Sequence, residues 1–209
     1  MSGTAARFQP GAQLVLDCRP GKAAGHLVFT YRVENRGVAG ALVMDAMTPR
    51  ARPGQKQPGP PNDQVATVLF AEDGSALVGK VLPPLPTDRA VIAVAPPLCI
   101  LLSPGEGMER ELRLPLPFAE GNPYLPDLTL RQYAPAAVAA VVLAIGWWPE
   151  DLPGLHAAPL SSAPDFHLVS PPAGHGKVPL ATRRFPTNGL EILRRLDSFP
   201  RILTSHRVV

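Results

Sequence analysis

The chain has 209 residues, of which 45% are hydrophobic and 18% charged, so it is long enough for one large domain and is not disordered by composition. Its net charge is +3, but residues 1–176 carry 13 Lys and Arg against 15 Asp and Glu (−2), whereas residues 177–209 carry 7 against 2 (+5). Because the basic charge is confined to the tail, a nucleic-acid-binding surface across the whole domain is excluded.

Proline is the outlier of the composition, with 27 residues. Since proline breaks helix interiors and central strands, we expect short elements, many loops and no long helix. No signal peptide is visible in residues 1–13, and the apolar run 135–149 is too short to span a bilayer comfortably. These features predict a cytoplasmic protein without a transmembrane segment.

The first predicted strands are 13–19, 26–34 and 40–47. The second of these has the clearest alternation, with one apolar face made of Leu27, Phe29, Tyr31 and Val33. Asn35-Arg36-Gly37 follows it directly, and this is a turn sequence. We therefore expect a hairpin that joins 26–34 to 40–47.

The middle of the chain begins with a long proline-rich loop, residues 48–64. Asp73-Gly74 then lies between two apolar runs, a pattern typical of a hairpin with a type I′ turn. Two short strands are expected at 89–95 and 98–103, followed by a strand at 108–116. In this last strand Arg110 falls on the apolar face, and we expect its long side chain to reach out to water.

The last third contains the most apolar segment, 136–148, in which β-branched residues favour a central strand buried on both faces over a helix. A further short strand is expected at 166–170. Residues 187–199 are predicted to form a helix, with Asn188 as its cap and leucines that recur every three residues.

Many short strands with frequent turns predict a mainly β fold, an antiparallel immunoglobulin-like β-sandwich, with a barrel as the alternative. Residues 1–176 would form this domain, with its long loop at 48–64. Residues 177–209 would form a basic C-terminal segment with one short helix packed on the domain.

The order of turns carries a family resemblance. A strand ending in "ENRG" (34–37), a long loop, an "EDG" hairpin (72–74) and the strand "SPGEGMERELRLPL" (103–116) resemble immunoglobulin-like domains. The layout is similar to that of the BsuPI-type intracellular proteinase inhibitor family over residues 26–118. The resemblance implies binding in place of catalysis, and it assigns a role to no individual residue.

Sequence motifs of catalysis are absent. The chain contains no phosphate-binding loop, no dinucleotide-binding glycine pattern and no nucleophile elbow, so we assign no catalytic residue, cofactor or metal ligand. One ionisable group is of interest, because His156, His167 and His175 lie close together in sequence with Asp165 beside them. Their spacing matches no metal motif, and surface histidines are the alternative interpretation.

The two cysteines, Cys18 and Cys99, both lie in strand-like apolar runs. They are either buried free thiols or one disulfide between neighbouring strands.

Two features suggest a partner. Alternation places Trp147 and Trp148 on opposite faces, so one should be buried and the other should point outward as an anchor, unless it packs under the following loop. Arg194 and Arg195 would lie beside the leucine stripe of the predicted helix and could contact an acidic partner or a membrane surface. The alternative is a helix that simply covers one end of the domain.

The first functional hypothesis is therefore a non-enzymatic protein-interaction module whose partner is a protein and not a nucleic acid. The second is a metal-dependent or hydrolytic enzyme that uses the region of His156, His167 and His175. The third is a structural subunit of a larger assembly. The sequence leaves the oligomeric state open.

Overall fold

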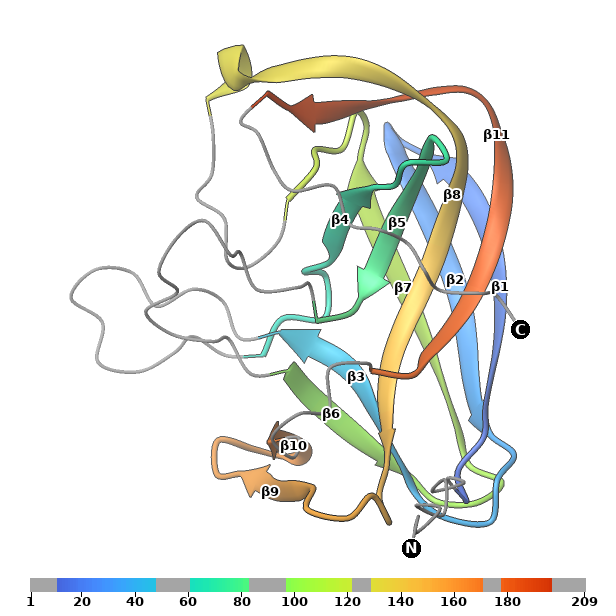
Figure 1. Cartoon of the computed structure of the whole chain (residues 1–209), viewed down its shortest axis with the longest axis vertical. Coiled ribbons are helices and arrows are strands. Elements are labelled where there is room, and N and C mark those ends of the chain that lie inside the picture. The colour runs from blue at the N-terminus through green and yellow to red at the C-terminus, as the bar shows by residue number, and fades with distance from the viewer. Residues whose placement is uncertain (1–10, 48–60, 83–96, 122–128, 171–177, 197–209) are drawn as a thin grey trace, which may run out of the picture.

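The computed structural model describes residues 11–47, 61–82, 97–121, 129–170 and 178–196. This part of the chain is mainly β, as the sequence predicts, and contains no α-helix (Figure 1). Its elements are β1 (Leu14–Ala23), β2 (His26–Asn35), β3 (Ala41–Met47), β4 (Thr67–Phe70), β5 (Ser75–Lys80), β6 (Pro97–Leu102), β7 (Gly107–Pro115), the 3₁₀ turn η1 (Leu130–Gln132), β8 (Tyr133–Pro149), β9 (His156–Leu160), β10 (Ala163–Ser170) and β11 (Leu180–Arg195). None of the described residues belongs to a helix that could cross a membrane.

The strands form two sheets. The smaller has the order β1-β2-β7, and the larger has the order β4-β5-β8-β3-β6-β10-β9, with β11 paired to β8. Neighbouring strands are antiparallel except β5 and β8, which are parallel. The two sheets share one apolar core, to which the smaller sheet contributes Phe29 and Leu112 and the larger Val78 and Leu143. The arrangement is therefore two curled β-layers around a common core, as in sandwiches and barrels.

One end of the larger sheet closes into a ring. The short segment 118–121 bonds to β4 through Val68 and Gly121, whose backbone N–H groups each donate to the other's carbonyl (2.8 and 2.9 Å). It also bonds to β11, because Glu120 N donates to Leu193 O (2.8 Å). The circuit runs from β4 through β5, β8 and β11 back to β4, so this end of the sheet leaves no open edge between β4 and β11.

The alternation in β2 is confirmed, because Leu27, Phe29, Tyr31 and Val33 are all buried. The hairpin expected after it is wrong. Residues 36–40 carry the chain from β2 in the smaller sheet to β3 in the larger one, and β3 pairs with β6 and β8. Asn35 holds this crossing: its buried side chain donates to Ala39 O and Leu102 O (both 2.9 Å) and accepts from Gly37 N (3.0 Å).

The hairpin at Asp73-Gly74 is confirmed, since β4 and β5 pair around it. Its turn type differs from the prediction, because Gly74 has a positive φ (74°) and Asp73 does not. The turn with two positive φ values instead joins β1 and β2, at Ala24 (46°) and Gly25 (76°). Ala24 is an unusual residue for this conformation, because its Cβ approaches the backbone there.

We expect Ala24→Asn to stabilise the protein by about 0.5–1 kcal/mol, because asparagine tolerates a positive φ and Asn-Gly is the preferred pair for this turn. Urea unfolding at equilibrium measures the change. The neighbouring exposed residue Ala23, which has an ordinary φ, supplies the control Ala23→Asn. An equal gain in both variants would contradict the role of backbone conformation.

The predicted C-terminal helix is wrong. Residues 187–195 belong to β11, in which Leu190 and Ile192 are buried while Glu191 between them is exposed. This period of two is that of a strand, and β11 pairs with β8 along most of its length, across a bulge between Pro186 and Leu190. The tail up to residue 196 is therefore part of the larger sheet and not an appended segment.

The segment 136–148 is a strand, as predicted, but it is part of a longer one. β8 and β11 are the two longest strands, and they arch together over the side of the molecule (Figure 1). The strand predicted at 166–170 is confirmed as the end of β10, and that at 98–103 as most of β6. The strand expected at 89–95 and most of the loop 48–64 lie outside the described residues.

Candidate functional site

Both tryptophans are buried, so the expected outward anchor is wrong. They do point to opposite faces of β8, as alternation predicts. Trp147 lies in the core between the two sheets, and Trp148 lies in a second apolar cluster on the other face with Leu42 and Leu152. Neither indole offers a surface to a partner, and Trp148 packs under the residues that follow β8, which is the alternative interpretation.

The two arginines lie on a strand and not beside a helical leucine stripe. The Arg194 guanidinium lies over the ring of Phe70 in β4, 4.4 Å from the ring centroid. Arg195 is buried, and its backbone N–H donates to the Glu120 carboxylate (3.1 Å). Of the two, only Arg194 retains a side chain that is partly exposed.

The histidines described by the structure do not converge. In the β9–β10 hairpin His156 is opposite Ser170, and His167 is opposite Pro159. Because residues 156 and 159 differ by an odd number, the two imidazoles project to opposite faces of the hairpin. Within the described ranges, no group of three His, Cys, Asp or Glu side chains could hold a metal ion. His175 lies outside these ranges.

The cysteines are free thiols and not a disulfide. Burial raises the pKa of the half-buried Cys18 thiol to about 12, with a smaller contribution from Asp17, and burial also raises the pKa of Cys99. Since the thiolate is the reactive form, neither side chain is suited to nucleophilic catalysis.

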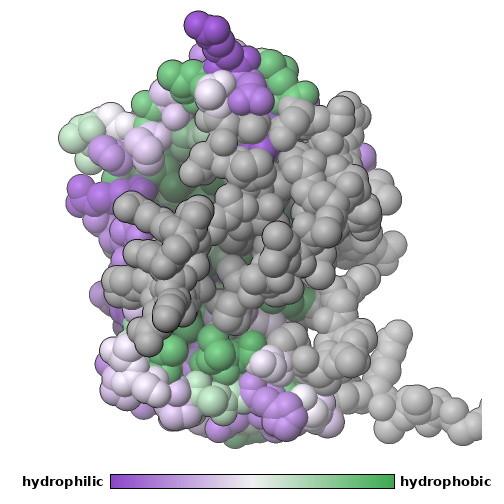
Figure 2. Space-filling view, turned by 90° about the vertical axis from the view of Figure 1, so that its left-hand side faces the viewer, coloured by the Kyte–Doolittle hydropathy of each residue, from purple (hydrophilic) through white to green (hydrophobic). Residues whose placement is uncertain are grey.

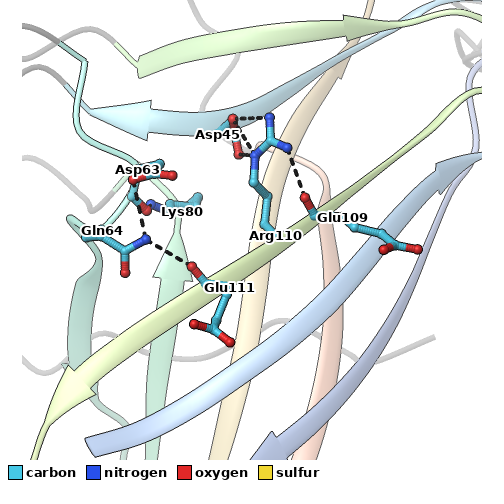
Figure 3. Close-up of polar contacts among 7 residues, drawn as sticks. All are labelled: Asp45, Asp63, Gln64, Lys80, Glu109, Arg110 and Glu111. Carbon is cyan, nitrogen blue, oxygen red and sulfur yellow. Dashed lines mark hydrogen bonds and ion pairs between the residues drawn. The ribbon is translucent and has the colours of Figure 1, made fainter.

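The most highly charged feature of the interior is a pair between the sheets. Arg110 from β7 and Asp45 from β3 meet there (Figure 3). Arg110 Nε lies 3.0 Å from both carboxylate oxygens, and Arg110 Nη2 lies 2.9 Å from Oδ2. Asp45 is 1% exposed, and the Arg110 side chain pairs with this carboxylate while it stays 32% exposed, so it reaches water in part, as expected. The hydrogen bonds to Asp45 raise the pKa of Arg110.

Lys80, at the end of β5, is the second buried charge of this region. Its ammonium donates to the carbonyl oxygens of Asp63 and Val65 (3.0 Å to the latter) and so fixes the segment before β4. In the same segment the Gln64 amide donates to Glu111 O (3.0 Å) and accepts from Arg113 N (3.1 Å) on the edge of β7 (Figure 3). These bonds join the two sheets. The polar groups that form them therefore have a structural role.

Burial lowers the pKa of Lys80 to about 8, because loss of solvation outweighs the attraction of Asp45 and Asp63. The unfolded chain keeps the lysine proton up to about pH 10.5, so between about pH 8 and pH 10.5 it binds more protons than the folded chain. We therefore expect the lysine to make the free energy of unfolding rise with pH across this window, by at most about 3 kcal/mol.

This prediction is checked by urea unfolding of the wild type and Lys80→Met from about pH 7 to about pH 10. The raised pKa of Tyr31 and Cys18 lowers stability at the alkaline end, but both proteins share these groups and their difference cancels the effect. A stability difference between wild type and variant that is constant with pH would contradict the lowered pKa.

A surface cluster missed by the sequence analysis lies at the η1 end of the molecule. Its residues are Leu130, Arg131, Arg194 and Leu196, and we call it the leucine–arginine end. Leu130 is 78% exposed and Leu196 is 60% exposed, and Leu196 N donates to Gln132 O (2.9 Å), which ties the end of β11 to η1. Figure 2 shows hydrophobic and hydrophilic surface side by side at this end.

No signal in the sequence joins these four residues, because Leu130 and Leu196 come from distant segments. Leu196 was expected on the buried stripe of a helix, whereas it follows the last residue of β11.

A comparison of the chain with protein-family models, with curated proteins and with solved structures finds no match.

Proposed function

We propose that the chain is a non-enzymatic protein-interaction module that binds its partner through the leucine–arginine end. The observation that carries this proposal is the exposure of Leu130 and Leu196 at the same end of the molecule, where a bond from Leu196 N to Gln132 O joins their segments. Among the described residues, Val38 is the other large hydrophobic residue with such exposure, and it lies alone in the segment between β2 and β3.

Two neighbouring exposed leucines favour a partner on energetic grounds. Covering a leucine side chain contributes about 1.5–3 kcal/mol, so the pair supplies several kcal/mol once it is covered. That is enough for a specific but moderate interaction after the cost of association, with arginines as rim contacts.

The immunoglobulin-like layout is part of the same proposal. A three-stranded sheet packed on a larger sheet supports it, and the segments "ENRG" and 103–116 that resemble BsuPI-type inhibitors overlap β2 and β7 of the smaller sheet. A sandwich of that kind would suit binding, since such frameworks present partners with the segments at their ends.

The test is cross-linked affinity capture from cells of the source with three proteins: wild type, Leu130→Ser/Leu196→Ser, and Val38→Ser. Val38→Ser is the matched control, because it removes an exposed apolar side chain elsewhere. We expect a protein captured by the wild type and by Val38→Ser and lost by the double variant. Equal capture by all three proteins would contradict the proposal.

A further inference from the structure

Within the described part of the chain, the two arginines of the leucine–arginine end lack the acidic partners that several other surface arginines have. Arg32, Arg36, Arg113 and Arg184 each form an ion pair with a carboxylate of the chain. By contrast, among the described residues no hydrogen bond or ion pair holds the side chains of Arg131 or Arg194. Two guanidinium groups without acidic partners therefore flank the two exposed leucines.

Among the described residues, one carboxylate near Arg194 is bound by the backbone. Glu120 lies in the segment that closes the ring, and its Oε1 accepts from Phe70 N (3.2 Å) while its Oε2 accepts from Arg195 N (3.1 Å). Both oxygens thus complete backbone hydrogen bonds of β4 and β11. Glu120 is therefore held by the backbone and forms no ion pair with Arg131 or Arg194.

The position of Arg194 prepares it for an external carboxylate. Its guanidinium lies over Phe70 at the distance of a cation–π contact, with 4.4 Å between Cζ and the ring centroid. A guanidinium in such a contact has restricted motion, and no described residue accepts a hydrogen bond from its N–H groups, which can pair with a carboxylate. Less conformational entropy is then lost when an acidic group binds.

From these observations we infer that the partner is an acidic protein segment whose carboxylates pair with Arg131 and Arg194 while its apolar side chains cover Leu130 and Leu196. This inference rests on the proposed function and adds the charge of the partner. Such rim pairs are sensitive to salt and set the association rate and specificity more than the affinity.

The test uses two synthetic labelled peptides that form amphipathic helices with the same leucine face, one with glutamates and the other with lysines on the opposite face. Fluorescence anisotropy with the full chain should show binding of the glutamate peptide that weakens as salt rises, and at least about tenfold weaker binding of the lysine peptide. Arg131→Glu should weaken the glutamate peptide about three- to tenfold. Arg19→Glu is the matched control, because Arg19 is exposed on β1 and has no acidic partner there.

Equal binding of the two peptides, or equal effects of Arg131→Glu and Arg19→Glu, would overturn the acidic partner. If Leu130→Ser/Leu196→Ser nevertheless abolishes binding of both peptides, the proposed function stands and only the acidic character of the partner is wrong. If the leucine variant binds like the wild type, the proposed function itself fails. A lipid surface is the other possible partner. The inference would be overturned in its favour if the protein bound phosphatidylserine vesicles but neither peptide, and if Arg131→Glu abolished vesicle binding.

Discussion

A chain that ends at residue 176 should fail to unfold cooperatively, although the sequence alone predicts that residues 1–176 fold by themselves. The truncation removes β11, which is the antiparallel neighbour of β8 from Tyr133 to Gly146. It also removes Leu190 and Ile192 from the shared core, and their burial accounts for about 3–6 kcal/mol. Domains of this size are stable by about 5–15 kcal/mol, and the ring closure at Leu193 is lost as well.

Thermal unfolding followed by near-ultraviolet circular dichroism measures this effect, because Trp147 and Trp148 report on packing in the two apolar clusters. The matched control ends at residue 196 and keeps all of β11. We expect a cooperative transition in the control and a broad or missing one in the shorter chain. Equal transitions in both would show that β8 does not need β11.

The error about this segment has a physical cause. Leu190, Leu193 and Leu196 recur every three residues and suggest a helix, whereas Leu190 and Ile192 with Glu191 between them suggest a strand. A short segment can satisfy both periods, and the neighbouring strand decides between them. Pairing with β8 is a long-range contact, and it cannot be predicted from the periodicity of a short segment.

The prolines do not have the predicted effect on strand length. We expected 27 prolines to shorten the elements, yet β8 and β11 are long. Pro20, Pro115 and Pro159 lie in β1, β7 and β9, which are edge strands of the two sheets, and Pro186 lies at the bulge of β11. An edge strand has backbone groups without a ladder partner, so it tolerates proline, and proline also discourages edge-to-edge aggregation.

What the sequence predicts well is local. The alternation of β2, the hairpin at Gly74 and the strand character of 136–148 follow from patterns within a few residues. The candidate site could not be predicted from the sequence. Leu130 and Leu196 reach the same end of the molecule through the pairing of β8 with β11, which is a long-range contact. The buried ion pair leaves a signal in the sequence, because Asp45 and Arg110 each place a charge in an otherwise apolar strand and the two charges are opposite.

The Asp45–Arg110 pair leads to the other large expected effect. Arg110→Ala should lower the free energy of unfolding by about 3–5 kcal/mol, because it leaves the Asp45 carboxylate, 2% exposed, without its partner in the interior. The exposed pair of Arg32 and Glu109 on the adjacent strands provides the control, and Arg32→Ala should cost less than about 1 kcal/mol.

The double variant Asp45→Leu/Arg110→Met separates the two possible origins of that loss. If the cost comes from an unpaired buried charge, replacing both partners with apolar side chains should recover most of the stability lost in Arg110→Ala. If it comes from lost packing of the arginine stem, the double variant should stay as unstable as the single one. Urea unfolding of the four proteins gives the answer, and we expect recovery, because Asp45 is almost fully buried where the two sheets meet.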